Sequence, residues 1–218
     1  MVKRKSAVEK RDGETETRIL NAAKAVFIRH GTSGARMQDI AEEAGVNQAL
    51  LHYYFRSKEK LSEAVFRDTA GRMFPALIQI VGSDRSLDEK IDLIVETYLT
   101  QMTRTPFIPG YVISELHHHP ERIRQLLGQL TNSGDIGALT RPAFDRLEKQ
   151  LAAEARAGRI RRINAPQFFV NLVSLCIFPF AAQPMLRAAF GFDADDFAKF
   201  IEQRRKDLPV YIRSAIKP

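Results

Sequence analysis

The feature that most constrains the fold is a three-residue break, Gly45 to Asn47, between two short patterns of helical spacing. After the break, Leu51 and Phe55 lie four residues apart, on the inner face of a helix predicted over Gln48 to Phe55. Gly45 tolerates the left-handed conformation of a tight helix stop, and Asn47 has the side chain of a good N-cap. Before the break, the apolar residues recur at i, i+3, i+4 and i+7: Met37, Ile40, Ala41 and Ala44. Two short helices joined in this way predict a helix-turn-helix.

Helices are also predicted on both sides of this motif. An earlier helix ends at Gly31, and its apolar face carries Ile19, Ala23, Val26 and Phe27. A fourth helix follows, with Ser57 as its cap and Glu59 in its first turn, where the helix dipole favours negative charge. The N-terminal part of the chain is therefore predicted to be a small helical domain.

The remainder, from Leu61 to Pro218, shows helical patterns and no convincing strand pair. We expect an all-α fold with three parts: a basic flexible tail over residues 1–13, a three-helix helix-turn-helix domain over 14–60, and a larger helical ligand-binding and dimerisation domain over 61–218. Residues 171–186 are apolar on every side and contain two prolines. This stretch is short for a membrane span, so we interpret it as a helix buried on both faces.

The charge distribution favours a polyanionic partner. The net charge is +7, and residues 1–60 contain 12 Lys and Arg against 8 Asp and Glu.

The single cysteine, Cys176, excludes an internal disulfide and is expected to behave as a small buried hydrophobe. The first residues are charged where a secretion signal would be apolar, so a cytoplasmic location is expected.

At this point the motif shows a family resemblance. The stretch DIAEEAGVNQALLHYYFRSKEKL is similar to the DNA-binding signature of TetR-family transcriptional regulators, and the similarity extends from Ile19 to Leu61. The resemblance implies a homodimer that binds a near-palindromic double-stranded DNA operator, most often as a repressor that a small-molecule inducer releases. The effector is expected to be largely apolar, and no cofactor is expected.

The resemblance also implies roles for individual residues. Tyr53 and Tyr54 match the pair that touches the sugar-phosphate backbone, and Lys58 matches a lysine that grips a phosphate. Gln48 and Ala49 occupy positions that read base edges. The expected DNA-binding residues are Arg36, Gln38, Asn47, Gln48, Ala49, Leu50, His52, Tyr53, Tyr54 and Lys58. Among them Leu50, His52 and Arg36 depart from the family pattern, in which Thr, Tyr, and Thr or Ser are usual.

Two further sites are predicted in the second domain. Candidate ligand-binding residues are Phe74, Tyr98, Met102, Phe107, Tyr111 and His118, although most of them could equally form an ordinary core. Candidate dimer-interface residues are Phe144, Leu147, Leu151, Phe168, Phe169, Leu172 and Val173, which form apolar stripes on two C-terminal helices.

The sequence gives little support to other chemistry. The segment ELHHHP at 115–120 groups imidazoles with a carboxylate, but adjacent helical histidines diverge by about 100°, so no metal site is assigned. There is no nucleophile elbow, phosphate-binding glycine loop or HExxH zinc motif, so no enzyme is predicted. The alternatives are an activator of the same architecture, a small-molecule-binding module or enzyme with an incidental helix-turn-helix, and an adaptor whose basic face binds an acidic protein.

Overall fold

The chain folds into helices arranged in two compact units, Met1–Thr69 and Ala70–Pro218. The computed structural model describes residues 2–118, 128 and 135–218, and this part of the chain contains no strand. The all-α fold class is therefore confirmed. The division falls inside α4 (Lys58–Gly82), whereas the sequence placed the domain boundary after residue 60.

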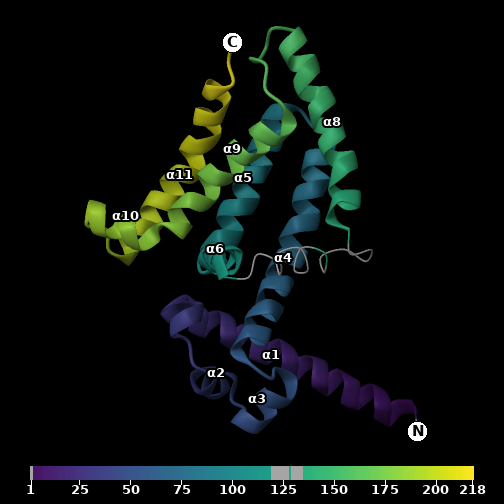
Figure 1. Cartoon of the computed structure of the whole chain (residues 1–218), viewed down its shortest axis with the longest axis vertical. Coiled ribbons are helices and arrows are strands. Elements are labelled where there is room, and N and C mark those ends of the chain that lie inside the picture. The colour runs from purple at the N-terminus through teal and green to yellow at the C-terminus, as the bar shows by residue number, and fades with distance from the viewer. Residues whose placement is uncertain (1, 119–127, 129–134) are drawn as a thin grey trace. The chain divides into compact units, whose positions relative to one another are not determined.

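The first unit contains α1 (Val2–Gly34), α2 (Met37–Ala44), α3 (Gln48–Tyr54) and the first part of α4 (Figure 1). The apolar face predicted from Ile19 to Phe27 is fully buried. The helix was expected to end at Gly31, and there the backbone leaves helical geometry with φ 67° before α1 resumes to Gly34. α1 also includes residues 2–13, and the flexibility expected of this basic segment stays a prediction.

The second unit is built around α5 (Leu87–Arg104). Its described residues also form α6 (Ile108–His118), α8 (Ile136–Arg156), α9 (Ala165–Ala181), α10 (Gln183–Phe190) and α11 (Ala194–Ala215). Helices α9 and α11 both pack on α5, and α8 packs on α9 (Figure 1). Together they enclose one hydrophobic core, which includes Cys176. The Cys176 thiol has no exposed surface, and burial raises its pKa to about 12, although nearby Arg204 acts in the opposite direction.

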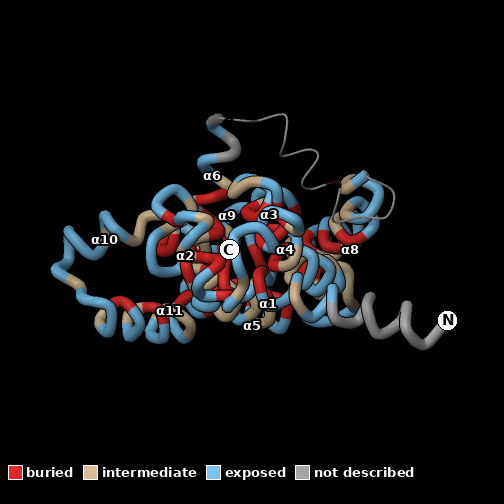
Figure 2. Tube along the Cα trace, turned by 90° about the horizontal axis from the view of Figure 1, so that it is seen from below, coloured by how far each residue is buried: buried red, intermediate tan, exposed pale blue. Residues whose placement is uncertain are grey.

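The prediction of a single helix over 171–186, buried on both faces, is wrong. α9 ends at Ala181, α10 begins at Gln183, and the two helices are bent by 68°. Pro184 in the first turn of α10 explains the break, because proline has no backbone N–H and its ring clashes with the carbonyl four residues earlier. One face is also open, with Val170 60% and Phe178 54% exposed. Figure 2 shows α10 as a largely exposed helix.

No single helix among the described residues is long and apolar enough to cross a membrane, although α9 and α10 together, with their bend, reach the required length and composition.

Candidate nucleic-acid interface

The turn between α2 and α3 has the geometry that the sequence predicted. Gly45 is left-handed, with φ 62° and ψ 38°, and its N–H donates to Glu42 O at 3.0 Å. Asn47 caps α3, because its Oδ1 accepts from Leu50 N at 2.7 Å. Leu51 is fully buried and Phe55 is 6% exposed, so the inner face of α3 is fixed in the core of the first unit.

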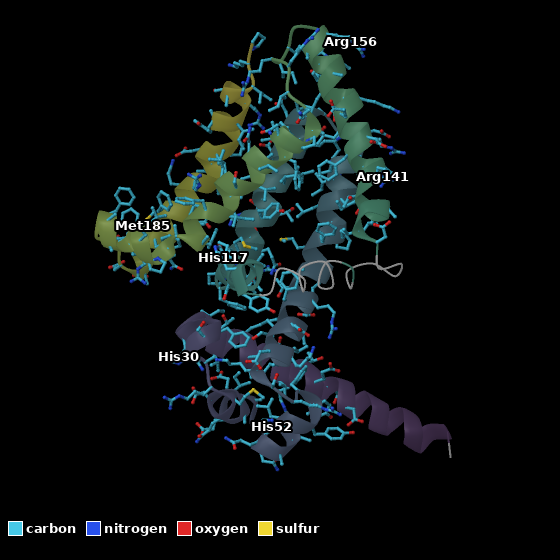
Figure 3. The ribbon with its side chains drawn as sticks, in the orientation of Figure 1. His30, His52, His117, Arg141, Arg156 and Met185 are labelled. Carbon is cyan, nitrogen blue, oxygen red and sulfur yellow. The ribbon has the colours of Figure 1, made fainter. Side chains whose placement is uncertain are left out.

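The opposite face of α3 is open to solvent. Gln48, Ala49, Leu50, His52 and Tyr53 are all exposed. Tyr53 is 77% exposed, more than the other exposed large hydrophobic residues in the described part of the chain. Figure 3 labels His52 on this helix, and its Nδ1 lies 3.4 Å from Arg56 O. A short helix with amide, imidazole and phenol groups on one free face can present hydrogen-bonding groups to base edges and phosphates in a DNA groove.

Tyr53 and Tyr54 are neighbours that face different surroundings. Their rings meet edge to face, with centroids 5.3 Å apart. Tyr54 is only partly exposed, and its hydroxyl donates to Asp12 Oδ1 at 3.0 Å. Burial and the bond with Asp12 raise the pKa of Tyr54. The sequence did not identify Asp12, because no local pattern links residues 42 positions apart.

Lys58 binds the end of α1 within the first unit. Its Nζ donates to Ser33 O at 2.9 Å and to Ala35 O at 3.2 Å. Ser57 Oγ accepts from Lys60 N at 3.3 Å, which confirms the predicted cap of α4. An ammonium group has three N–H donors, so Lys58 can hold both carbonyls and still donate to a phosphate.

The start of α2 carries two more of the expected residues. Arg36 is the N-cap residue, and it is exposed and makes no side-chain capping bond. An arginine side chain has no acceptor for the free N–H groups of the first turn, so α2 begins without a side-chain cap. Gln38 is exposed, and its Nε2 donates to Glu42 Oε1 at 3.1 Å along the helix.

Three of the predicted ligand-binding residues are buried, namely Tyr98, Met102 and Tyr111. Tyr98 and Met102 belong to the hydrophobic core, and burial raises the pKa of Tyr98. Phe74 and Phe107, in contrast, are partly exposed. The side chain of His118 lies outside the described residues. A ligand site made by these residues stays a prediction.

The predicted dimer residues divide into two groups. The buried group is enclosed in the core of its own chain and has almost no surface left for a partner: Leu147, Leu151, Phe168 and Leu172. The partly exposed group comprises Phe144, Phe169 and Val173. The rings of Phe144 and Phe169 pack edge to face, with their centroids 5.1 Å apart. The placement of a dimer interface on α8 and α9 stays a prediction.

An exposed row of residues on α9 was not predicted from the sequence. Val170, Ser174 and Phe178 recur every four residues and line an apolar groove of about 380 Å³, together with Ile113 of α6. The helical spacing was visible in the sequence. However, the exposed side carries two large apolar residues, Val170 and Phe178, so hydrophobicity alone did not separate it from the side that faces the core.

The histidine segment brings no described ligands together. His117 is exposed, and its Nδ1 lies 2.9 Å from Ile113 O (Figure 3). Within the described residues, no three His, Cys, Asp or Glu side chains are grouped as metal ligands. The side chains of Glu115, His118 and His119 lie outside the described residues.

Two family models match the chain. The first, described as bacterial regulatory proteins of the tetR family, covers residues 19–65. The second, described as a tetracyclin repressor-like C-terminal domain, covers residues 88–208. The first match contains α2 and α3, and the second contains most of the second unit.

Similar curated proteins are named as transcriptional repressors. The HTH-type transcriptional repressor NicS of Pseudomonas putida is 25% identical over 201 residues, which cover 90% of each chain. An HTH-type transcriptional repressor of Streptomyces coelicolor is 33% identical over 117 residues, or 51% of this chain and 59% of that relative. The second match therefore spans less than two thirds of the relative.

Solved structures share the fold. HlyIIR, a hemolysin II transcriptional regulator, has a TM-score of 0.57 at 23% identity, covering 94% of this chain and 98% of that one. FadR from Bacillus subtilis, solved in complex with stearoyl-CoA, has a TM-score of 0.59 at 16% identity, covering 92% and 98%.

Proposed function

Because this chain belongs to the tetR family of bacterial regulatory proteins, we propose that it is a homodimeric transcriptional regulator that binds a specific double-stranded DNA operator. The observation that carries this proposal is α3, whose inner face is locked in the core by Leu51 and Phe55 while its outer face is free. A rigid helix with one free polar face suits the major groove of DNA.

The exposed side chains divide into two kinds of contact. Gln48 and Ala49 lie in the first turn of α3, where an amide can pair with an adenine edge and a methyl can touch thymine. Leu50 adds an apolar contact. Tyr53, Lys58 and Arg36 have hydroxyl or cationic groups for the phosphate backbone. We propose that the first group gives sequence preference and the second gives affinity.

The second copy of the chain is proposed to dock on α8 and α9. Val170 and Phe178 are each more than half exposed, and together with the partly exposed Phe169 they form an apolar surface of the kind that protein interfaces cover. A twofold dimer would place two copies of α3 in successive major grooves, roughly 34 to 36 Å apart, and would read a near-palindromic operator.

A repressor released by a small molecule is the proposed mode of regulation. Two relatives are named as repressors, and the FadR structure contains stearoyl-CoA. α4 begins in the first unit and ends in the second, so a change in the second unit can reach the DNA-binding helices. The ligand must bind the low-affinity dimer state better than the DNA-bound state. Because the partner is DNA, the cytoplasm is the proposed site of action, and no catalytic role is proposed.

Selection from a random pool of duplex DNA with the full-length protein tests this function. We expect an enriched sequence with twofold symmetry and half-sites about one helical turn apart. The Gln48→Ala variant should lose the preference at one base pair of each half-site and keep the spacing. Gln203→Ala, which removes an exposed glutamine of α11, is the matched control and should select the wild-type sequence.

Two results would contradict the proposal. Failure to enrich any duplex would exclude specific DNA binding. Equal binding to all duplexes would favour the adaptor alternative, in which the basic face binds an acidic protein and DNA only competes for that face. In addition, the affinity for the selected duplex should fall steeply with salt, because phosphate contacts release counterions.

A further inference from the structure

The hydroxyl of Tyr54 is already bonded inside the protein. It donates to Asp12 Oδ1 at 3.0 Å, and it also makes a side-chain hydrogen bond with Thr15. Asp12 and Thr15 lie three positions apart on α1, so both reach the same point on the end of α3. A phenol hydroxyl has a single proton, so Tyr54 cannot give that proton to a phosphate while Asp12 holds it.

The charge of Asp12 also matters for DNA binding. Asp12 is exposed, and its carboxylate accepts from the Tyr54 hydroxyl. The ring of Tyr54 in turn contacts the ring of the exposed Tyr53. A phosphate that approached this hydroxyl would meet a negative charge at close range. Like charges at such a separation repel, most strongly at low ionic strength.

We propose that Asp12 limits the affinity for DNA by competing with a backbone phosphate for the hydroxyl proton of Tyr54. This inference rests on the proposed function. In the free protein the Asp12–Tyr54 bond joins α1 to α3. In the complex either Asp12 or a phosphate accepts this proton, and Tyr53 and Lys58 provide backbone contacts for which Asp12 does not compete.

A double-mutant cycle on Asp12 and Tyr54 tests this competition. The selected duplex is titrated with full-length protein, and binding is followed by fluorescence anisotropy. Asp12→Ala removes both the acceptor and the charge, and should tighten binding roughly two- to fivefold, the range of one exposed charged contact. Asp12→Asn, which keeps the size of the side chain, should tighten binding by less, since its amide oxygen can still accept.

The Tyr54→Phe substitution in this cycle distinguishes competition for the hydroxyl proton from a simple effect of the Asp12 charge. Tyr54→Phe in the wild-type background should change the affinity less than about twofold, because the lost proton was held by Asp12. In the Asp12→Ala background the same substitution should remove most of the gain. Glu16→Ala, at an exposed carboxylate on the same helix, is the matched charge control and should tighten binding less than Asp12→Ala.

Three outcomes would overturn the inference while DNA binding stands. Asp12→Ala could weaken binding, which would make Asp12 a residue that positions α3. It could match Glu16→Ala, which would leave only a general charge effect. The effects of Asp12→Ala and Tyr54→Phe could also simply add. If the wild-type protein binds no duplex at all, the proposed function itself fails, and the competition with it.

Discussion

Each unit of this protein contains a lysine that holds the backbone carbonyls at the end of a helix. In the first unit, Lys58 Nζ donates to Ser33 O and Ala35 O, and its side chain is partly exposed. In the second unit, Lys90 Nζ donates to Val81 O at 2.9 Å and to Gln150 Oε1 at 2.7 Å, and the residue is 1% exposed. The bonds are of the same kind, but only one of the two ammonium groups meets water.

The surroundings of Lys90 show that it fixes the end of α4. From α8, Arg146 Nη1 donates to Gly82 O at 3.0 Å, and Gln150 Nε2 donates to Arg85 O at 2.9 Å. Since Lys90 belongs to α5, side chains of both α5 and α8 bond to the end of α4 and the turn after it. A methyl group added at Gly82 would lie 3.1 Å from Ala143 Cβ, which shows how closely α4 approaches α8. Exposure separates the two lysines: Lys90 is enclosed within the second unit, whereas Lys58 is partly exposed and is proposed to keep a donor for DNA.

The largest expected effect is on stability, and it comes from Lys90. Lys90→Met keeps the apolar stem but leaves Val81 O and Gln150 Oε1 without their donor in a buried site. We expect a loss of about 2 kcal/mol in the free energy of unfolding. Lys58→Met should cost less than about 1 kcal/mol, because water can replace the ammonium there. Urea unfolding of both variants measures the difference, and equal losses of unfolding free energy would show that burial does not make Lys90 more important for stability than Lys58.

The second effect is on DNA affinity, and it should come from Lys58. Lys58→Met should weaken binding to all duplexes by roughly tenfold and reduce the slope of log K against log salt by about one. Lys60→Met is the control, because Lys60 is exposed and paired with Glu63, and it should have a smaller effect. An unchanged salt slope in Lys58→Met would show that this lysine only caps α1.

Arginine substitutions test how much room surrounds each of the two lysine side chains. Lys58→Arg keeps the charge in an open site, and we expect near wild-type stability and DNA affinity. Lys90→Arg places a larger, planar group in a packed site, and we expect a loss of about 1 to 2 kcal/mol in unfolding free energy. Thermal unfolding of the two variants tests this order, and a destabilised Lys58→Arg with a neutral Lys90→Arg would contradict it.

The smallest expected effect is a dependence on pH. Burial is the main cause that lowers the pKa of Lys90 from its ordinary value of 10.5, with nearby Asp84 acting in the opposite direction. Between the folded-state pKa and 10.5 the unfolded chain binds a proton that the folded chain has released, so Lys90 adds stability as the pH rises through this range. The difference in urea midpoint between wild type and Lys90→Met should therefore grow from pH 7 to pH 10. A constant difference would show that Lys90 keeps its proton.

Much of the first unit could be predicted from its residues, because the signals are local. The conformation of Gly45, the cap by Asn47 and the burial of Leu51 each depend on neighbours within four residues along the chain. The break at Gly31 was also visible. Prediction was weaker for α9, because its exposed side also carries large apolar residues, and hydrophobicity alone did not separate that side from the core side. Val170 and Phe178 were therefore missed, and Phe168 and Leu172 were assigned to a surface that packing closes.

The sequence by itself determined the helical class, the helix-turn-helix and the outward face of α3, because helix periodicity and capping act over a few residues. Only the tertiary structure decided that Tyr54 meets Asp12, that Lys58 reaches back to α1, and that Lys90 of α5 is buried with its ammonium group bonded to α4 and α8. These contacts join residues 9 to 60 positions apart, and the same side chain could have met water instead. The packing of whole helices places the partners, so no short stretch of residues encodes the pairing.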